Sequence, residues 1–457
     1  MVFPTLQFIL FFALVLVLNG LVWSRGTWRK ALLIAASYTF YAAWDVRFLA
    51  LMAGVSAVAW IGGLVPSRAA RIASVAALIA TLALFKYFNF FALSLQQLLN
   101  ATMFARDMQW ISIILPVGVS FYIFQAVSYV IDAHRGHITP RRNPTDVFLY
   151  ISFFPQLVAG PIVRAAHFLP QIDAPVVPDA AARALAAVLI LMGLFKKMVV
   201  ANYLSVLLVD PAFALPEGQN TITAIAATLG YAVQIYCDFS GYSDIAIGIA
   251  LLLGYRFQRN FNQPYRAASL REFWQRWHIS LSTWIRDYLY IPLGGNSGSV
   301  LRQTCTALLT MTLAGLWHGA GWNFLLWGFL HGAGLMAERV LRPRIRLPQA
   351  IATALVFGFV CLLWIPFRAA DPAETVAMLG AVVSPTGFAP VDLSVTALVL
   401  IAIGIAVNWL PMRWLPATQS ALARLPAPAQ AGLLASGIWL MFAAAQDGVA
   451  PFIYFQF

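Results

Sequence analysis

The stretch ALLIAASYTFYAAWDVRFLALMAGVSAVAWIGGLV, residues 31–65, decides the fold class. It holds two long apolar runs, and its charged side chains, Asp45 and Arg47, fall between them. An α-helix needs about 20 apolar residues to cross the hydrocarbon core of a bilayer. Each run is therefore predicted to be a membrane-spanning helix, and the charged pair marks the loop that joins the two helices.

The composition of the whole chain agrees with this pattern. Of its 457 residues, 61% are hydrophobic and only 10% are charged, whereas soluble domains carry charge on about a quarter of their positions. A soluble chain of this length would need polar side chains to cover its surface, so the excess apolar surface is expected to face lipid. The net charge of +12 comes from basic residues in short loops. That distribution is typical of membrane orientation and argues against a nucleic-acid partner.

Further apolar runs of suitable length occur along the chain. The candidate spans are 3–23, 30–46, 48–66, 71–95, 111–131, 145–162, 183–208, 220–237, 243–256, 301–317, 322–340, 350–367, 393–410 and 428–445. We predict an all-α, polytopic integral membrane protein with about 10 to 12 transmembrane helices plus re-entrant or interfacial helices. Residues 1–457 are expected to form a single transmembrane domain, with a motif-rich core at about 115–334.

Basic residues alternate between loops, which predicts orientation. Three loops carry basic residues: Arg25, Arg29 and Lys30; Arg68 and Arg71; and Arg135, Arg141 and Arg142. The intervening loops hold only Arg47 and the Arg106/Asp107 pair. Because basic loops stay in the cytoplasm, the N-terminus is predicted to lie outside. The same count places the central cluster from Arg256 to Arg276, and the later one from Arg339 to Arg346, inside.

The first segment and the cysteines carry less information. Val2 to Trp23 lacks a basic region before it and a small-residue cleavage site after it, so it is predicted to be a retained span. Cys237, Cys305 and Cys361 lie in apolar stretches without paired spacing and are expected to be buried thiols.

The segment REFWQRWHISLSTWIRDYLY, residues 271–290, is the most polar part of the middle of the chain. Its apolar residues recur at steps of three or four, which predicts one continuous amphipathic helix. The other face carries Arg271, Gln275, His278, Ser282 and Arg286. His278 is expected to project among cations and hydroxyls, and Glu272 to pair with Arg276 four residues on. An interfacial helix that touches anionic lipid heads is the alternative.

Two histidines occur in MTLAGLWHGAGWNFLLWGFLHG, residues 311–332. A histidine inside a membrane is costly unless it has a partner or lines a wet cavity, so function is the default hypothesis for His318 and His331. The chain leaves the inner side after Arg302 and returns by Arg339. His318 is therefore expected toward the outer half, and His331 nearer the cytoplasm. The glycines of this stretch also permit close helix packing, which is the structural alternative.

The segment QIYCDFSGYSD, residues 234–244, interrupts a long apolar run with two carboxylates. Gly241 predicts a break between two helices. Asp238 and Asp244 cannot both face lipid, so they are expected to pair, bind a proton or line an aqueous path. Orienting a histidine or an arginine is the role we favour for them.

Elimination leaves histidine as the catalytic candidate. The sequence has no Gly-rich phosphate loop, metal-ligand cluster or Gly-x-Ser-x-Gly elbow. The pKa of histidine lies near neutrality, so it can take a proton from a hydroxyl as that hydroxyl attacks a thioester. A proton-coupled transporter is the alternative from another class, since intramembrane Asp and His can form a proton relay. Such a transporter is expected to contain an inverted repeat, and none is detected.

Several long motifs occur in order along the chain. They are LPVGVSFYIFQAVSYVIDAHRG (115–136), FPQLVAGPIVR (154–164), GLFKKMVVANYL (193–204), QIYCDFSGYSDIAIGIALLLGY (234–255), NFNQPYRAASLREFWQRWHISLSTWIRDYLYIPLGGN (260–296), GLWHGAGWNFLLWGFLHG (315–332) and PFIYFQF (451–457). In these motifs the sequence resembles the membrane-bound O-acyltransferase (MBOAT) family, in its bacterial branch of alginate O-acetylation and teichoic-acid D-alanylation proteins. The sequence departs from the family pattern after Gly295, where it reads NSGSVLRQTCTALL.

The resemblance implies site residues. His318 matches the family's signature histidine in WHG, and His278 matches its second histidine in RWHISLS. Supporting or channel-lining roles are expected for Asp238, Asp244, Ser282, Trp317, Asn323 and His331. Arg271, Arg276 and Arg286 are expected to form a basic face on the donor side.

The resemblance also implies a reaction. An acyl group, preferably acetyl, would pass from a cytoplasmic thioester, either acetyl-coenzyme A or an acyl carrier protein, to a hydroxyl outside. The acceptor would be an exported polysaccharide or a periplasmic acetyltransferase partner. D-alanyl transfer to teichoic acid and acetyl transfer to peptidoglycan are the alternatives with the same fold. We expect no bound cofactor, metal or nucleic acid, and a location among the lipids of the bacterial cytoplasmic (inner) membrane.

Overall fold

The computed structural model describes residues 3–102, 111–158, 160–216, 219–342, 344–345, 347–383 and 393–445. Every regular element in these ranges is helical, which confirms the predicted all-α class. The Arg106/Asp107 pair, Arg346 and the motif at 451–457 lie outside the described residues. The chain divides into two compact units, one comprising residues up to 177 with 250–257, and the other residues 178–249 with 258–457.

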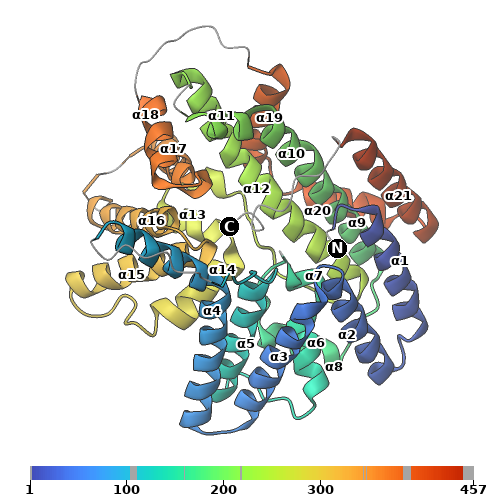
Figure 1. Ribbon diagram of the computed structural model, residues 1–457. Helices are drawn as coiled ribbons and strands as arrows, with labels where there is room; N and C mark the ends of the chain where they lie inside the picture. Colours follow the sequence, from blue (N-terminus) through green and yellow to red (C-terminus); the bar gives the residue numbers. More distant parts are fainter. Residues whose placement is uncertain are drawn as a thin grey trace. The chain divides into compact units, whose positions relative to one another are not determined.

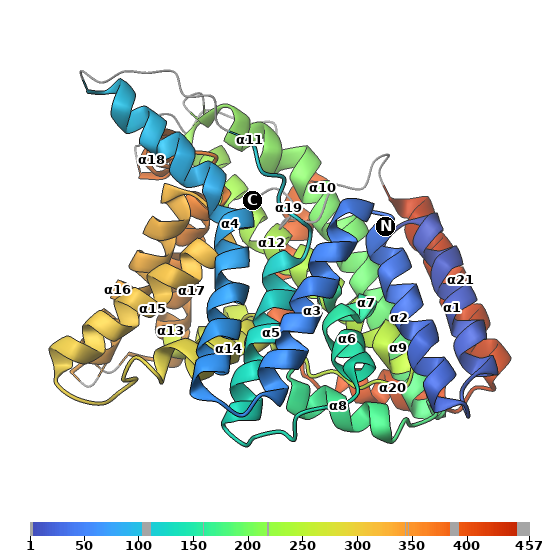
Figure 2. The ribbon, with the colours of Figure 1, turned by 60° about the horizontal axis from the view of Figure 1, so that its bottom comes forward.

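The described residues of the first unit form eight α-helices and a short 3₁₀ turn. They are α1 (Leu6–Leu21), α2 (Gly26–Ala42), η1 (Val46–Phe48), α3 (Leu49–Leu64), α4 (Arg68–Asn100), α5 (Val119–His134), α6 (Pro144–Ser152), α7 (Phe154–Leu157) and α8 (Ala165–Asp173). Helices α3, α4 and α5 pack together and lie side by side in both views (Figures 1 and 2). Helix α5 begins later than the predicted span 111–131, because Gly118 before it has a left-handed backbone with φ 71°. Within the candidate span 145–162, α6 and α7 are separated at Phe153.

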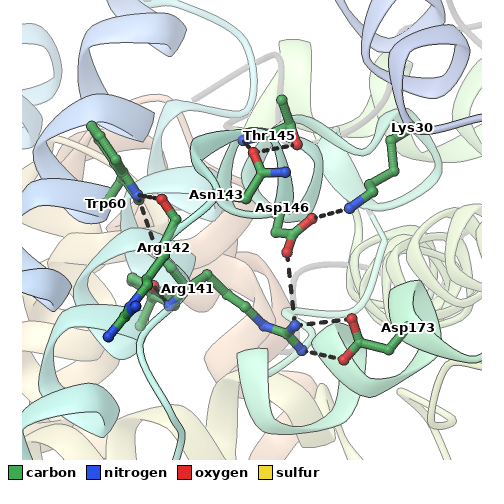
Figure 3. Close-up of polar contacts among 9 residues, drawn as sticks. Lys30, Trp60, Arg141, Arg142, Asn143, Thr145, Asp146 and Asp173 are labelled. Carbon is green, nitrogen blue, oxygen red and sulfur yellow. Dashed lines mark hydrogen bonds and ion pairs between the residues drawn. The ribbon is translucent and has the colours of Figure 1, made fainter. Parts of the chain in front are cut away.

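A network of charged side chains connects several helices and loops of the first unit (Figure 3). Asp146 of α6 lies 2.6 Å from Nζ of Lys30 and 3.7 Å from Nη1 of Arg141. Arg141 also donates to both carboxylate oxygens of Asp173 at the end of α8, at 2.9 and 2.6 Å. Trp60, near the end of α3, donates its indole N–H to the carbonyl of Arg141 at 3.0 Å. These contacts therefore bring together the start of α2, the end of α3, the loop before α6 and the end of α8.

The second unit holds the histidines and the paired carboxylates. Its elements are α9 (Ala180–Leu194), η2 (Phe195–Ala201), α10 (Asn202–Leu204), η3 (Ser205–Val209), α11 (Asp210–Ala214), α12 (Thr221–Leu252, its last three residues grouped with the first unit), η5 (Pro264–Arg266), α13 (Leu270–Arg276), α14 (Ile279–Ile285), η6 (Arg286–Tyr290), α15 (Val300–His318), α16 (Trp322–Leu341), α17 (Gln349–Arg368), α18 (Pro372–Val383), α19 (Val395–Ala406), η7 (Val407–Trp409), α20 (Trp414–Ala423) and α21 (Ala427–Ala444). η2, η3 and η6 are π-helical turns, which are often found at functional sites.

Six helical segments of the described chain are long and apolar enough to cross a membrane, or seven if one bent pair counts as a span. The six are Val46–Leu64, Arg68–Asn100, Ala180–Ala214, Thr221–Leu252, Gln349–Arg368 and Ala427–Ala444, and the bent pair is Val395–Trp409 with Trp414–Ala423. The chain is therefore a multi-pass membrane protein. Helices α1 and α5, at 16 residues each, are shorter than the 20 or so that a span needs.

Helix α12 runs unbroken for 32 residues, so the predicted break at Gly241 is wrong. The glycine serves close packing instead. A Cβ at position 241 would lie 2.7 Å from the carbonyl oxygen of Gly193 and 3.2 Å from Cβ of Lys196. Only glycine therefore lets the end of α9 and the start of η2 pack this closely on α12, which brings the lysines of η2 next to the carboxylates of α12.

Helices α15 and α16 form a tightly packed hairpin, seen side by side in both views (Figures 1 and 2). A Cβ at Gly315 would meet the carbonyl oxygen of Phe324 and lie 3.0 Å from Cα of Gly328. The glycines of this segment thus permit close backbone approach, as the packing interpretation predicted.

One prediction about the cysteines is wrong. Cys237 and Cys361 are buried, but Cys305 is exposed. It occupies an outward-facing position near the start of α15, where Leu301 and Arg302 are exposed as well.

Candidate active site

His278 lies at a sharp break between two short helices. Its backbone is left-handed, with φ 41° and ψ 56°, and it ends the run that α13 begins. The predicted continuous helix over 271–290 is therefore wrong. Residues 260–262 run alongside the break, where the N–H of Asn262 donates to the carbonyl of Arg276 at 2.9 Å and that of Ile279 donates to the carbonyl of Asn260 at 2.8 Å. These bonds hold a backbone conformation that a residue with a Cβ seldom adopts.

The sequence explains where α13 begins. Ser269 caps the helix, since its hydroxyl accepts the N–H of Glu272 at 3.0 Å. Glu272 in turn accepts the N–H of Ala268 at 2.9 Å, an arrangement close to a capping box. Glu338 of α16 accepts the N–H of Leu270, which ties the start of α13 to α16.

The imidazole of His278 is fully buried among aromatic rings. Its ring centroid lies 4.5 Å from that of Phe239 and 6.1 Å from that of Trp317. Nδ1 lies 3.2 Å from Oδ1 of Asn260. The expectation that His278 projects among cations is therefore wrong, because the break turns its side chain away from the arginine face. Burial lowers the pKa of His278, which keeps the imidazole neutral near pH 7.

The arginines of the predicted basic face differ in their surroundings. Arg276 forms the predicted pair with Glu272, at 2.8 Å. Although burial raises the pKa of Glu272, the N–H of Ala268 and the guanidinium of Arg276 together bring it below its usual value. Arg271 and Arg286 are exposed, and Arg286 pairs with Asp287 at 2.7 Å. Of the three arginines predicted for this face, Arg271 and Arg286 are thus the exposed ones.

His318 ends α15 and is buried, with 3% of its surface exposed. The ring centroids of Trp317, Trp327 and Phe367 lie 5.0, 5.1 and 5.3 Å from that of His318. Trp317 therefore contacts the imidazoles of both His278 and His318. The two predicted catalytic histidines come from distant parts of the sequence, yet one indole lies against both of them.

His331 lies one step further along the same aromatic cluster. Its ring centroid is 4.7 Å from that of Trp327 and 5.0 Å from that of Trp274. Among the described residues, neither ring nitrogen of His331 has a hydrogen-bond partner. The three histidines are thus linked through tryptophans, in the order His278, Trp317, His318, Trp327 and His331.

Two predicted supporting residues stabilise turns. Asn323 donates to the carbonyl of Ala369 at 3.0 Å and accepts the hydroxyl of Thr375 at 3.2 Å, which fastens the start of α16 to α18 and the turn before it. The hydroxyl of Ser282 donates to the carbonyl of Trp277 at 3.1 Å, across the break. Both side chains therefore form hydrogen bonds that stabilise the local structure.

The two carboxylates of α12 are paired with consecutive lysines of η2. Asp244 lies 2.7 Å from Nζ of Lys196, and Asp238 forms an ion pair with the almost fully buried Lys197. The expectation that the carboxylates pair is confirmed, with lysines as the partners. The lysines were visible in GLFKKMVVANYL, because two cations in an apolar run require two anions.

Asn260 is another residue that the motifs did not single out. It is 1% exposed, and its amide lies among His278, Ser280 and Ser243. The sequence gives only a weak signal, an asparagine 18 positions before the histidine. No group of three or more His, Cys, Asp or Glu residues within the described ranges could hold a metal ion.

Several apolar helices and a cluster of buried imidazoles define a multi-pass membrane protein with a candidate site for proton transfer in surroundings of low polarity. The chain belongs to the membrane-bound O-acyltransferase family, whose model matches residues 79–366. It is therefore an acyltransferase, as the motifs predicted.

Three relatives illustrate the similarity. The chain is 40% identical over 385 residues to the probable alginate O-acetylase of Pseudomonas aeruginosa, covering 81% of this chain and 72% of that protein. It is 33% identical over 402 residues to the peptidoglycan O-acetyltransferase of Helicobacter pylori, covering 80% and 76%. It is 30% identical over 233 residues to the teichoic acid D-alanyltransferase of Streptococcus thermophilus, covering 48% and 56%.

Proposed function

We propose that this protein transfers an acetyl group from a cytoplasmic thioester to a hydroxyl outside the membrane. The acceptor is an exported polysaccharide, or a periplasmic acetyltransferase partner that passes the group on. The observation that carries the proposal is the contact of Trp317 with both His278 and His318. The likeness to alginate O-acetylases over about four fifths of the chain supports acetyl as the group and polysaccharide as the acceptor.

The chemistry requires a proton acceptor beside the attacking hydroxyl. His318 takes the proton while the hydroxyl oxygen bonds to the thioester carbonyl carbon. The C–S bond then breaks, and the thiolate leaves with a proton returned from imidazole. His278 lies on the donor side, where it accepts this proton from His318 and passes it to the departing thiolate. The contact of both imidazoles with the same indole, that of Trp317, supports this shared role.

The distribution of basic residues supports an orientation in the membrane and an anionic acyl donor. The N-terminus lies outside, and about 10 to 12 crossings, α15 and α16 among them, place the basic loops in the cytoplasm of a bacterial cell. The exposed cations Arg271 and Arg286 attract an anionic donor, either acetyl-coenzyme A or an acyl carrier protein. No cofactor is held permanently, because the thioester itself brings the reactive group.

Thiol release by the purified full-length chain in nanodiscs tests this proposal. Acetyl-coenzyme A and an acetyl-loaded acyl carrier protein are supplied in parallel with an acceptor glycan. His318→Gln is expected to lower the rate by about 10²- to 10⁴-fold, the usual loss when a general base is removed. His137→Gln, at a side chain that is 62% exposed, serves as the histidine control and retains the rate. Transfer at the unsubstituted rate by His318→Gln removes His318 from the chemistry.

Acetyl transfer to peptidoglycan is a second candidate, favoured by the 33% identity to the Helicobacter pylori enzyme. D-alanyl transfer has weaker support, since that similarity covers about half of the chain. Mass spectrometry of surface glycans from a deletion strain separates the three, because it reports the lost group and its acceptor together. A transporter would release no thiol in detergent, where no gradient exists.

A further inference from the structure

The side chain of Asn260 is the centre of a buried hydrogen-bond cluster. Its Oδ1 lies 3.1 Å from the backbone nitrogen of Ser280, 2.9 Å from the hydroxyl of Ser280 and 3.2 Å from Nδ1 of His278. Its Nδ2 donates to the hydroxyl of Ser243 on α12 at 3.2 Å. The amide thus connects α12, the loop before η5 and the break that presents His278.

The backbone N–H of Ser280 fixes the orientation of this amide. A backbone N–H can only donate, so the atom of Asn260 that faces it is the oxygen. The nitrogen of the amide then points to Ser243, whose hydroxyl can accept. The opposite amide orientation would set two donors against each other at Ser280 and is excluded on that ground.

The orientation of the amide determines the tautomer of His278. An oxygen that accepts from Ser280 also faces Nδ1 of His278, so this nitrogen must carry a hydrogen. If Nδ1 held a lone pair, two acceptors would repel each other in a buried site. In a neutral imidazole with hydrogen on Nδ1, the lone pair is on Nε2.

We propose that Asn260 is a positioning residue for acyl transfer: it holds His278 as the Nδ1–H tautomer and so makes Nε2 the nitrogen that accepts and returns a proton. The inference deepens the proposed function and rests on it, because it assigns a proton-transfer atom to a histidine of that reaction. Asn260 itself acts through His278 and need not touch the substrate.

The side chain of Asn260 can be tested separately from its backbone. The carbonyl of residue 260 accepts the N–H of Ile279, and the N–H of Asn262 donates to Arg276, whatever side chain stands at position 260. A substitution there therefore removes the contact with Nδ1 while the backbone bonds that hold the break remain. This separation distinguishes a positioning role from a purely structural one.

A series of variants, assayed by thiol release from acetyl-coenzyme A and from acetyl-loaded acyl carrier protein, measures the contribution of the oxygen. Asn260→Leu is expected to lower kcat by about 10- to 100-fold with KM changed less than about twofold, as when the orienting partner of a histidine is lost. Asn260→Asp keeps an acceptor oxygen and is expected to stay at least about tenfold faster than Asn260→Leu.

Asn408→Leu is the matched control for the loss of a buried amide. Asn408 is fully buried, accepts the N–H of Tyr265 at 3.3 Å and donates to the carbonyl of Gly404 at 3.1 Å. Its replacement is expected to lower thermal stability while kcat of the folded protein stays unchanged. An equal fall of kcat in both leucine variants would overturn the proposal, because the loss of a buried amide that does not bond to His278 would then have the same effect on catalysis.

A methylated histidine provides the decisive arm. The background is Asn260→Ala, which leaves room beside Nδ1. Nδ1-methylhistidine at position 278 keeps the lone pair on Nε2. It is expected to raise kcat at least about tenfold above that of Asn260→Ala with ordinary histidine. Nε2-methylhistidine blocks that nitrogen and restores nothing. Equal rates with the two methylated residues refute the assignment of Nε2. Failure of the unsubstituted chain to release thiol from either donor refutes the proposed function instead, and this assignment with it.

Discussion

Lys197 and Asp238 form an ion pair in which both side chains are almost completely buried, at 2% and 4% exposure. The neighbouring pair, Lys196 with Asp244, is more open, at 13% and 17%. Two consecutive lysines of one π-helical turn thus each pair with a carboxylate of α12. Charges in such surroundings are stable only as pairs, so these contacts fix η2 on α12.

Removing one partner of the buried pair should destabilise the protein strongly. Asp238→Asn leaves the ammonium of Lys197 buried without its counter-charge, and the expected loss is about 3–5 kcal/mol of unfolding free energy. Thermal unfolding in detergent measures the effect. Asp287→Asn, which breaks the exposed pair with Arg286, is the control and should cost less than about 1 kcal/mol. Equal midpoints for the two variants would mean that the buried pair contributes little.

The hairpin of α15 and α16 should not accept a methyl group at Gly315. In Gly315→Ala the new Cβ meets the carbonyl oxygen of Phe324, so the helices must separate, at a cost of about 1–3 kcal/mol. Transfer should fall as well, because His318 lies one turn away on α15. Gly358→Ala in α17 is the matched control, since a Cβ there has no atom within 4 Å. That variant should be neutral or stabilised by up to about 1 kcal/mol. A folded, fully active Gly315→Ala chain would contradict the close packing.

Local patterns predicted the helices and the histidines, but not the break at His278. The steps of three and four across 271–290 are real, since Phe273, Trp277 and Leu281 are all buried. The periodicity predicted which residues are buried, and they are buried although Phe273 lies in α13, Trp277 at the break and Leu281 in α14. The left-handed turn depends on two backbone hydrogen bonds, one accepted by the carbonyl of Asn260 and one donated by the N–H of Asn262, and both residues are close to the break only in the folded chain.

The role of Gly241 is a second feature that the local sequence predicted wrongly. A glycine between two apolar runs predicts a break when only local conformation is considered. A glycine also permits close packing against another helix. Gly241 has this role, because the carbonyl oxygen of Gly193 on α9 occupies the position next to it. The partners of Asp238 and Asp244 could have been predicted, because Lys196 and Lys197 were the cations available within an apolar segment.

The charge network of the first unit should depend on Asp146. This carboxylate lies between Lys30 and Arg141 and is 5% exposed (Figure 3). Asp146→Asn leaves two cations near each other without their shared anion, so we expect a loss of about 1–3 kcal/mol, measured by thermal unfolding at low salt. Asp45→Asn breaks the exposed pair with Arg47 and should change little. A loss no greater than that of Asp45→Asn would show that the network is only a surface feature.

Position 278 should reverse the usual ranking of alanine and glycine. In a helix interior glycine is less stable than alanine by about 1 kcal/mol. At φ 41° the Cβ of alanine is strained and glycine is not, so His278→Gly should be more stable than His278→Ala by about 1 kcal/mol. Both variants lose the imidazole and should lose transfer together. The same two substitutions at Thr283, inside α14, supply the control and should show the ordinary order, with alanine the more stable. If alanine is the more stable residue at both positions, then His278 does not occupy a left-handed break and the local geometry of the site is wrong.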